Sequence, residues 1–365
     1  MDSVTELPPL PTIADAEAAA KTIAGVAIRT PLVNSPVLDE ATGARVFLKC
    51  ETLQRTGSFK FRGAYNKISS IPADKKAGGV VAYSSGNHAQ GVAHAATLCG
   101  VKSVVVMPSD APLPKRQRTA AFGAEVVLYD RDTEDRAAIA RRICAERGAT
   151  LVPPFDDPKI IAGQGTLGLE VMEDLARLGV KPDIAIVGCS GGGLIAGTSL
   201  ALKAKAPGIR IVAAEPEGFD DTLRSFKSGQ RERNPRMSGT ICDALMTETP
   251  GVITWEINRK LVGEGVAASD QEVGRAVAFA FREMKLVVEP GGAIGLAAML
   301  AGKVDIKGKV VIGVLSGGNI DPDLYYKLLT ARRAYRFRPR VRGDDRERQL
   351  LRGLIVREKP VLWPW

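Results

Sequence analysis

Short apolar runs alternate with longer amphipathic segments along almost the whole chain, and this alternation limits the possible folds more than any other feature. Some runs, such as 104–106 and 310–312, are apolar at consecutive positions, which suits strands buried on both faces. Strands that alternate with helices build parallel sheets with helices on both faces. Ligands bind such sheets beyond the carboxyl ends of the strands, so the residues after each run should carry the function.

The alternation predicts particular elements. We predict strands at residues 45–50, 80–83, 103–107, 125–129, 184–187, 209–214 and 310–315. We predict helices at residues 13–23, 61–68, 88–99, 114–122, 133–147, 164–178, 194–205, 270–284 and 293–301.

The length of 365 residues allows a large core and favours two domains. Pro153 and Pro154 interrupt the pattern near the middle, so we expect one domain from 1–52 with 153–330 and a smaller one from 53–152. We find no signal peptide and no apolar stretch long enough to cross a bilayer. Five scattered cysteines without a C-x-x-C pair fit reduced thiols, so we expect a cytoplasmic protein without membrane contacts.

The net charge of +9 is concentrated at the C-terminal end, which argues against a nucleic-acid partner. Residues 331–365 hold ten Arg and one Lys against four acidic residues, so this tail carries +7 and residues 1–330 carry +2. A nearly neutral globular part has no basic face for a nucleic acid. The tail is compatible with a floppy extension, an interaction arm or an artefact of expression, and we assign it no chemical role.

Lys60 follows the strand at 45–50 and a Gly-Ser turn, and it opens the helix at 61–68 between Phe59 and Phe61. Desolvation and the positive end of a helix both lower the pKa of an amine in such a place. A partly neutral amine can attack an aldehyde and form a Schiff base. The simpler interpretation is a surface lysine whose stem packs on aromatic rings.

The strand at 80–83 is followed by a polar turn, the 84–88 turn, which consists of Ser84, Ser85, Gly86, Asn87 and His88. Hydroxyl and backbone N–H groups at a helix start can bind a carboxylate. The simpler interpretation is that Ser85 or Asn87 caps the helix.

The strand at 184–187 is followed by a glycine-rich loop, the 190–194 loop, which consists of Ser190, Gly191, Gly192, Gly193 and Leu194. Glycines at a helix start expose backbone N–H groups to a phosphate, although a flexible turn is the simpler interpretation. The loop also matches G-x-G-x-x-A through Ala196, with Glu215 near the spacing expected for a ribose hydroxyl. A nicotinamide-dependent dehydrogenase is therefore an alternative, but it leaves Lys60 unexplained.

Two further groups follow strands. Ser316, after the strand at 310–315, carries a hydroxyl that can hydrogen-bond a ring nitrogen. The acidic turn at 215–221 can hold a hard cation through oxygen ligands, although a solvated turn with Asp220 or Asp221 as helix cap is the simpler interpretation. The two histidines of the chain are too few for a histidine-rich metal site and make a Ser-His-Asp triad unfavourable.

A Schiff-base lysine, a phosphate loop, a hydroxyl for a ring nitrogen and a carboxylate site together describe a pyridoxal phosphate enzyme acting on an amino acid. Over roughly residues 20–330 the sequence resembles the threonine/serine dehydratase and serine racemase group of fold-type II pyridoxal phosphate enzymes. Four motifs match that group in order, at 58–64, 84–88, 190–194 and 316–319. The resemblance implies two open, twisted, mainly parallel sheets with flanking helices, and a homo-oligomer, either dimer or tetramer.

The resemblance also implies roles for single residues. Lys60 would hold the cofactor and then move the α-proton, and Phe59 would lie against the cofactor ring. Asn87 would hydrogen-bond the ring hydroxyl, the backbone of the 190–194 loop would bind the phosphate, and Ser316 would face the pyridine nitrogen.

The remaining roles concern the substrate and a cation. The 84–88 turn would bind the substrate carboxylate, and Ser85 stands where the racemases have a second proton carrier. Glu215, the Phe219 carbonyl and Asp221 match the group's site for a divalent or monovalent cation. The chain departs from the group at Ala244, where members often have glycine, and this leaves the substrate more open than the cofactor.

A serine opposite the ring nitrogen makes the cofactor a weaker electron sink than a carboxylate would, which favours β-elimination. We therefore expect dehydration of L-threonine, L-serine or both to a 2-oxo acid and ammonia. Serine racemase and threo-3-hydroxyaspartate dehydratase are the alternatives within the group. The last helix that the resemblance implies ends near Thr330, and the about 35 residues after it are too few for an amino-acid-sensing regulatory domain, so we expect none.

Overall fold

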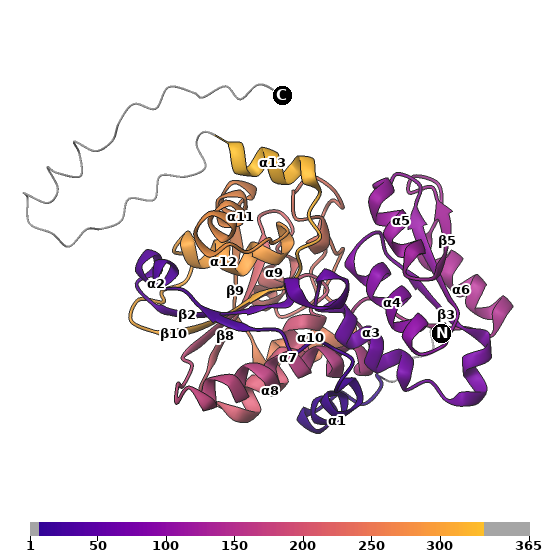
Figure 1. Ribbon diagram of the computed structural model, residues 1–365, viewed down its shortest axis with the longest axis horizontal. Helices are drawn as coiled ribbons and strands as arrows, with labels where there is room; N and C mark the ends of the chain where they lie inside the picture. Colours follow the sequence, from indigo (N-terminus) through magenta and orange to yellow (C-terminus); the bar gives the residue numbers. More distant parts are fainter. Residues whose placement is uncertain (1–6, 332–365) are drawn as a thin grey trace, which may run out of the picture.

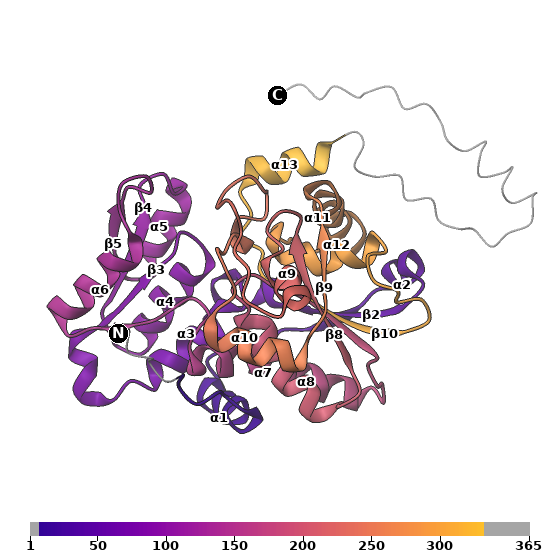
Figure 2. The same ribbon diagram turned by 180° about the vertical axis from the view of Figure 1, so that it is seen from behind.

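A computed structural model describes residues 7–331 of the chain. These residues form a larger and a smaller lobe, and each lobe is built around one sheet (Figure 1). The view from behind shows the same division (Figure 2). The predicted tail at 331–365 lies, from residue 332 onward, outside the described residues.

The strands are β1 (Leu32–Asn34), β2 (Arg45–Cys50), β3 (Val80–Tyr83), β4 (Ser103–Pro108), β5 (Ala124–Tyr129), β6 (Thr150–Leu151), β7 (Ile184–Gly188), β8 (Arg210–Pro216), β9 (Gly265–Ala268) and β10 (Val310–Leu315). The α-helices are α1 (Ile13–Ile23), α2 (Pro36–Thr42), α3 (Lys60–Ser69), α4 (Asn87–Leu98), α5 (Leu113–Ala121), α6 (Arg136–Arg147), α7 (Pro158–Arg177), α8 (Gly193–Lys205), α9 (Asp221–Ser228), α10 (Val252–Leu261), α11 (Asp270–Met284), α12 (Ile294–Leu300) and α13 (Pro322–Thr330).

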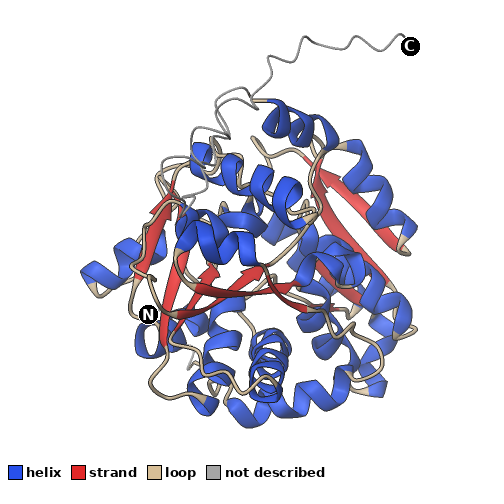
Figure 3. Cartoon of the chain, turned by 60° about the vertical axis from the view of Figure 1, so that its left-hand side comes forward, coloured by secondary structure: helices blue, strands red, loops and turns tan. Residues whose placement is uncertain are grey.

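The larger lobe contains a six-stranded sheet in the order β1-β2-β10-β7-β8-β9. Neighbouring strands are parallel except β1 and β2, which pair antiparallel. Successive side chains of a strand point to opposite faces. Val46 and Leu48 accordingly join the core under α11 and α12, whereas Phe47 joins the core against α7 and α8. Helices therefore cover both faces of the sheet (Figure 3).

The smaller lobe contains a four-stranded, fully parallel sheet in the order β5-β4-β3-β6. Val104 and Val106 pack with the apolar residues of α6, and Val105 and Met107 pack against α4 on the other face. The predicted α/β class with two open, mainly parallel sheets is thus confirmed. The division into 1–52 with 153–330 and 53–152 stays a proposal, which the separate sheets support.

Every predicted strand and helix is present, but several boundaries differ. The helix predicted at 164–178 begins earlier, as α7, because Asp157 accepts hydrogen bonds from the N–H groups of Lys159 and Ile160. The helix predicted at 133–147 begins later, as α6, after its cap Asp135. The elements α2, α9, α10, α13, β1, β6 and β9 were not predicted. None of the helices within residues 7–331 is long and apolar enough to cross a membrane.

Candidate active site

A cavity of about 340 Å³ lies between the two lobes, beyond the carboxyl ends of β3, β7 and β10. Every residue predicted to act in catalysis, cofactor binding or substrate binding lines it: Phe59, Lys60, Ser84, Ser85, Gly86, Asn87, His88, Ser190, Gly191, Gly192, Gly193, Leu194 and Ser316. The three residues predicted to hold a cation do not line it. Parallel strands thus bring motifs from distant parts of the chain to one place.

Three helices begin at this cavity: α3 at Lys60, α4 at Asn87 and α8 at Gly193. At none of the three does the side chain of the N-cap residue accept a hydrogen bond from the helix. The start of a helix carries a partial positive charge and free N–H donors, so the cavity favours anions. The idea that Ser85 or Asn87 caps α4 is wrong, because the N-cap position is occupied by Gly86.

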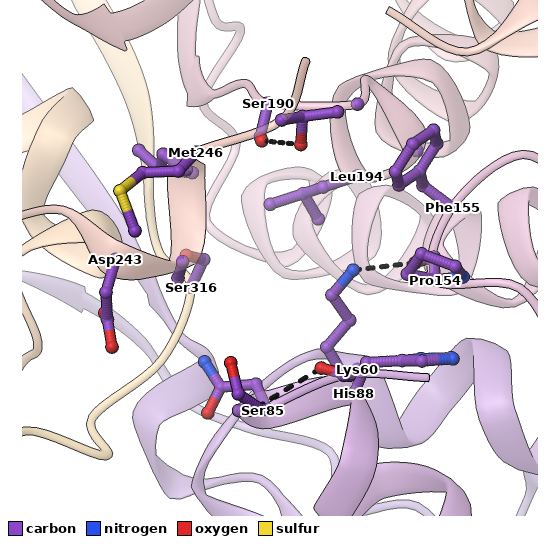
Figure 4. A pocket seen from close by; sticks show the side chains of 18 of the residues that line it. Lys60, Ser85, His88, Pro154, Phe155, Ser190, Leu194, Asp243, Met246 and Ser316 are labelled. Carbon is purple, nitrogen blue, oxygen red and sulfur yellow. Dashed lines mark hydrogen bonds between the residues drawn. The ribbon is translucent and has the colours of Figure 1, made fainter. Parts of the chain in front are cut away.

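Lys60 is half-buried, and its Nζ donates to the carbonyl oxygen of Pro154 at 2.7 Å (Figure 4). Its Nζ also lies 5.1 Å from the centre of the Phe59 ring. Burial lowers the pKa of the Lys60 amine to about 8. A substantial share of this amine is therefore neutral near physiological pH, as a nucleophile requires.

The 84–88 turn contributes both hydroxyls and a held amide. The Ser84 hydroxyl accepts the Gly86 N–H at 3.2 Å. Asn87 Nδ2 donates to Glu289 at 2.5 Å, and Asn87 Oδ1 accepts from Asn319 Nδ2 at 2.7 Å, so its amide orientation is fixed from both ends. Burial, together with the charge of Asp243, raises the pKa of Glu289 to about 7.

His88 is buried beside Lys60, and its Nε2 lies 2.9 Å from the carbonyl oxygen of Val152. Burial and the neighbouring Lys60 lower the pKa of His88 to about 3. The imidazole is therefore neutral at physiological pH, and we assign its proton to Nε2 because a carbonyl faces that atom. The side chain braces the backbone that follows β6.

The glycines of the 190–194 loop are explained by close packing on both sides. A Cβ atom at Gly191 would lie 2.4 Å from the Phe155 ring, and one at Gly193 would lie 2.9 Å from Phe155 Cβ. Gly192 has a φ of +91°, which favours glycine, and a Cβ there would meet Asn258 at 2.7 Å. The loop is therefore clamped between Phe155 and α10.

Ser316 follows β10, and its backbone connects the two lobes: its carbonyl oxygen accepts the Phe59 N–H at 3.0 Å. Its side chain is buried at the cavity wall. Ser190 follows β7, the strand next to β10, and its hydroxyl forms a hydrogen bond with Thr247 (Figure 4).

Several lining residues were missed by the sequence reasoning. Lys115 of α5 forms an ion pair with Asp243 at 2.5 Å, and this pair joins the smaller lobe to the larger one at the cavity wall. Arg136 lines the cavity and lies 5.6 Å from the Tyr83 ring. These contacts join residues far apart in sequence, so no local sequence pattern predicts them. Asp243 precedes Ala244, whose departure from the group pattern was the available signal.

Glu215 and Asp221 are fully buried and do not line the cavity. The two oxygens of Glu215 accept the N–H groups of Thr222 and Leu223, so Glu215 caps α9. This buried carboxylate cannot reach a ribose hydroxyl, and the nicotinamide alternative loses its support. Burial and the charge of Asp221 raise the pKa of Glu215.

The family described as pyridoxal-phosphate dependent enzyme matches residues 23–317. L-threo-3-hydroxyaspartate ammonia-lyase of Pseudomonas sp is 44% identical over 311 residues, which cover 85% of this chain and 96% of the relative. L-threonine ammonia-lyase of Thermotoga maritima is 42% identical over 318 residues, which cover 87% of this chain and 78% of the relative. The structure of maize serine racemase matches with a TM-score of 0.83 and 36% identity, over 87% of this chain and 97% of that one. The chain therefore belongs to the pyridoxal-phosphate-dependent enzymes, in the group of ammonia-lyases and racemases that its motifs indicated.

Proposed function

We propose that this enzyme removes water from L-threonine, L-serine or both, and releases a 2-oxo acid and ammonia. The observation that carries the proposal is the amine of Lys60, with its lowered pKa, inside a cavity on which three helix starts converge. Pyridoxal phosphate, when bound, supplies an aldehyde for the amino group and a conjugated ring that accepts electrons from the α-carbon.

The residues of the cavity fit this cofactor. The first N–H groups of α8 open on the cavity without a side-chain cap, which suits the phosphate, so we assign the 190–194 loop to it. Asn87, held by Glu289 and Asn319, would present its amide to the ring hydroxyl. Ser316 would face the ring nitrogen as a neutral partner.

The residues of the cavity would have separate roles in the reaction. Lys60 would hold the cofactor, yield its place to the substrate amine and take the α-proton at its freed Nζ. The 84–88 turn at the start of α4 would bind the substrate carboxylate. The neutral Ser316 favours loss of the β-hydroxyl group over a long-lived charge on the ring.

The experiment is product analysis with L-threonine, L-serine and L-threo-3-hydroxyaspartate. The proposal predicts a 2-oxo acid and an equal amount of ammonia from at least one of the first two. Formation of the D-isomer, with Ser85 as second proton carrier, would support racemisation, and Ser85→Ala should then abolish it. Absence of a 2-oxo acid from both L-threonine and L-serine contradicts the proposal, and its formation from L-threo-3-hydroxyaspartate alone would support the hydroxyaspartate alternative.

One observation favours L-threo-3-hydroxyaspartate as a second candidate substrate. Arg136 lines the cavity and forms no ion pair within residues 7–331, so its guanidinium is available to a second carboxylate. Arg136→Met should therefore reduce turnover of hydroxyaspartate much more than turnover of threonine. Arg141→Met is the matched control, because Arg141 lies on the same helix but does not line the cavity.

We further propose that a cation binds between Glu215, the Phe219 carbonyl and Asp221. Asp221 Oδ2 is buried without a hydrogen-bond partner, and burial raises the pKa of Asp221 to about 7. No cluster of three or more His, Cys, Asp or Glu side chains suited to a metal occurs within residues 7–331, so backbone oxygens would complete this site.

A cation binds ionised carboxylates, so its affinity should rise as the pH increases through about 7. Melting curves with Mg²⁺, Ca²⁺ or K⁺ at several pH values measure this. Stabilisation that persists in Asp221→Asn would contradict the assignment. The cytoplasmic location and the homo-oligomeric state stay predictions.

A further inference from the structure

Helix α10 holds the carbonyl groups of the 190–194 loop from outside the cavity. Thr254 Oγ1 donates to the Gly191 carbonyl oxygen at 2.6 Å, and the Gly251 N–H donates to the same oxygen at 3.2 Å. Asn258 Nδ2 donates to the Gly192 carbonyl oxygen at 3.3 Å. Thr254 is fully buried and does not belong to the cavity wall.

These hydrogen bonds determine where the N–H groups of the loop point. In a trans peptide unit the C=O of one residue and the N–H of the next point in opposite directions. Because the Gly191 carbonyl is turned toward α10, the Gly192 N–H is turned away from α10, on the side where Gly192 lines the cavity.

Asp156 fixes the start of α10 and thereby the place of Thr254. Its carboxylate accepts the N–H groups of Val252, Ile253 and Thr254 at 2.8, 2.9 and 3.1 Å. Asp156 directly follows Phe155, whose ring presses on the other side of the loop. The loop therefore has a rigid support on both sides.

We propose that Thr254 is a positioning residue that aims the Gly192 N–H at the phosphate of the cofactor, and that Asp156 holds Thr254 in register. The inference rests on the assignment of the 190–194 loop to the phosphate. It makes a selective prediction: loss of the Thr254 hydroxyl weakens recognition of the phosphate and leaves recognition of the ring and the aldehyde unchanged.

The test compares two ligands of the apoenzyme, pyridoxal 5'-phosphate and pyridoxal, by absorbance titration. The dissociation constant of pyridoxal divided by that of pyridoxal 5'-phosphate measures the contribution of the phosphate to binding. Thr254→Val, which replaces a hydroxyl by a methyl group, should reduce this ratio about tenfold, as expected for one lost hydrogen bond to a loop that binds a charge. Thr254→Ser keeps the hydroxyl and should keep the ratio.

A second measurement uses inorganic phosphate alone. Phosphate should raise the melting temperature of wild-type apoenzyme and of Thr254→Ser, but should raise that of Thr254→Val much less. Asp156→Asn should lower the ligand ratio in the same direction, and it replaces Thr254→Val if that variant does not fold.

The outcomes distinguish the assignment of the 190–194 loop to the phosphate from the positioning role of Thr254. A wild-type enzyme that binds both ligands equally would overturn the assignment of the loop to the phosphate. A wild-type enzyme that prefers the phosphate ester, with the same preference in Thr254→Val and Asp156→Asn, would overturn the role of Thr254 alone. Equal losses for both ligands would also overturn it, since they would indicate general damage to packing.

Discussion

Replacement of Arg62 by methionine should strongly destabilise the enzyme, although Arg62 does not line the cavity. Arg62 is fully buried and forms paired contacts with Glu51, at 2.8 and 2.8 Å, and with Glu170, at 2.7 and 2.9 Å. Lys49, also fully buried, joins Glu170 at 2.6 Å, so two cations and two carboxylates balance. This cluster ties α3, which begins with Lys60, to β2 and α7.

The size of the expected destabilisation follows from the burial of Arg62. Burial disfavours the guanidinium, but Glu51 and Glu170 outweigh it and raise the pKa of Arg62, so the charge is retained. Removal of one partner from a buried ion pair leaves an uncompensated charge and costs about 3–5 kcal/mol. That cost corresponds to a fall in melting temperature of roughly 4–7 °C for a chain of 365 residues.

The assay is thermal unfolding of the holoenzyme, followed by circular dichroism. Arg147→Met is the matched control, because Arg147 also pairs with a carboxylate through two contacts, but the side chains of Arg147 and Glu125 are 45% and 51% exposed. That control should barely change the melting temperature. The double variant Arg62→Met with Glu51→Gln should recover part of the lost melting temperature, because it removes the uncompensated charge of Glu51. Equal melting temperatures of Arg62→Met and Arg147→Met would refute the reasoning.

Two further predictions concern the amine and the helix packing. Apoenzyme should combine with pyridoxal phosphate faster as the pH rises through about 8, because Lys60 is protonated and unreactive below its pKa and neutral above it. Stopped-flow absorbance from about pH 6 to about pH 10 measures this, and a flat rate would contradict the assigned pKa. Gly197→Ala should lower the melting temperature, because its Cβ would lie 2.2 Å from the Ile161 carbonyl oxygen. Gly208→Ala should leave the melting temperature unchanged, because a Cβ atom at Gly208 meets no atom within 4 Å. Equal changes in melting temperature for the two variants would contradict this account of the packing.

The sequence predicted those lining residues that follow strands, because parallel sheets obey a simple rule. The 84–88 turn, the 190–194 loop and Ser316 each follow a buried strand, and the carboxyl ends of those strands face the cavity. The apolar runs also predicted the sheets themselves, since their side chains fill the cores on both faces.

Contacts over long sequence distances could not be predicted in the same way. Helix α10 is capped by Asp156, 96 residues before Val252, so no local signal marks its start. The three glycines of the 190–194 loop suggested a phosphate site, but their packing reason, Phe155 on one side and α10 on the other, needs the fold. Arg136 was missed because nothing in the sequence of α6 distinguishes a cavity residue from a solvated one.

The most direct test of the account is the identification of the lysine that carries the cofactor. Borohydride reduction of the holoenzyme, followed by proteolysis and mass spectrometry, should place the reduced cofactor on the peptide that contains Lys60, and Lys60→Ala should yield neither that adduct nor turnover. A cofactor adduct on another lysine, or full turnover by Lys60→Ala, would contradict the central claim.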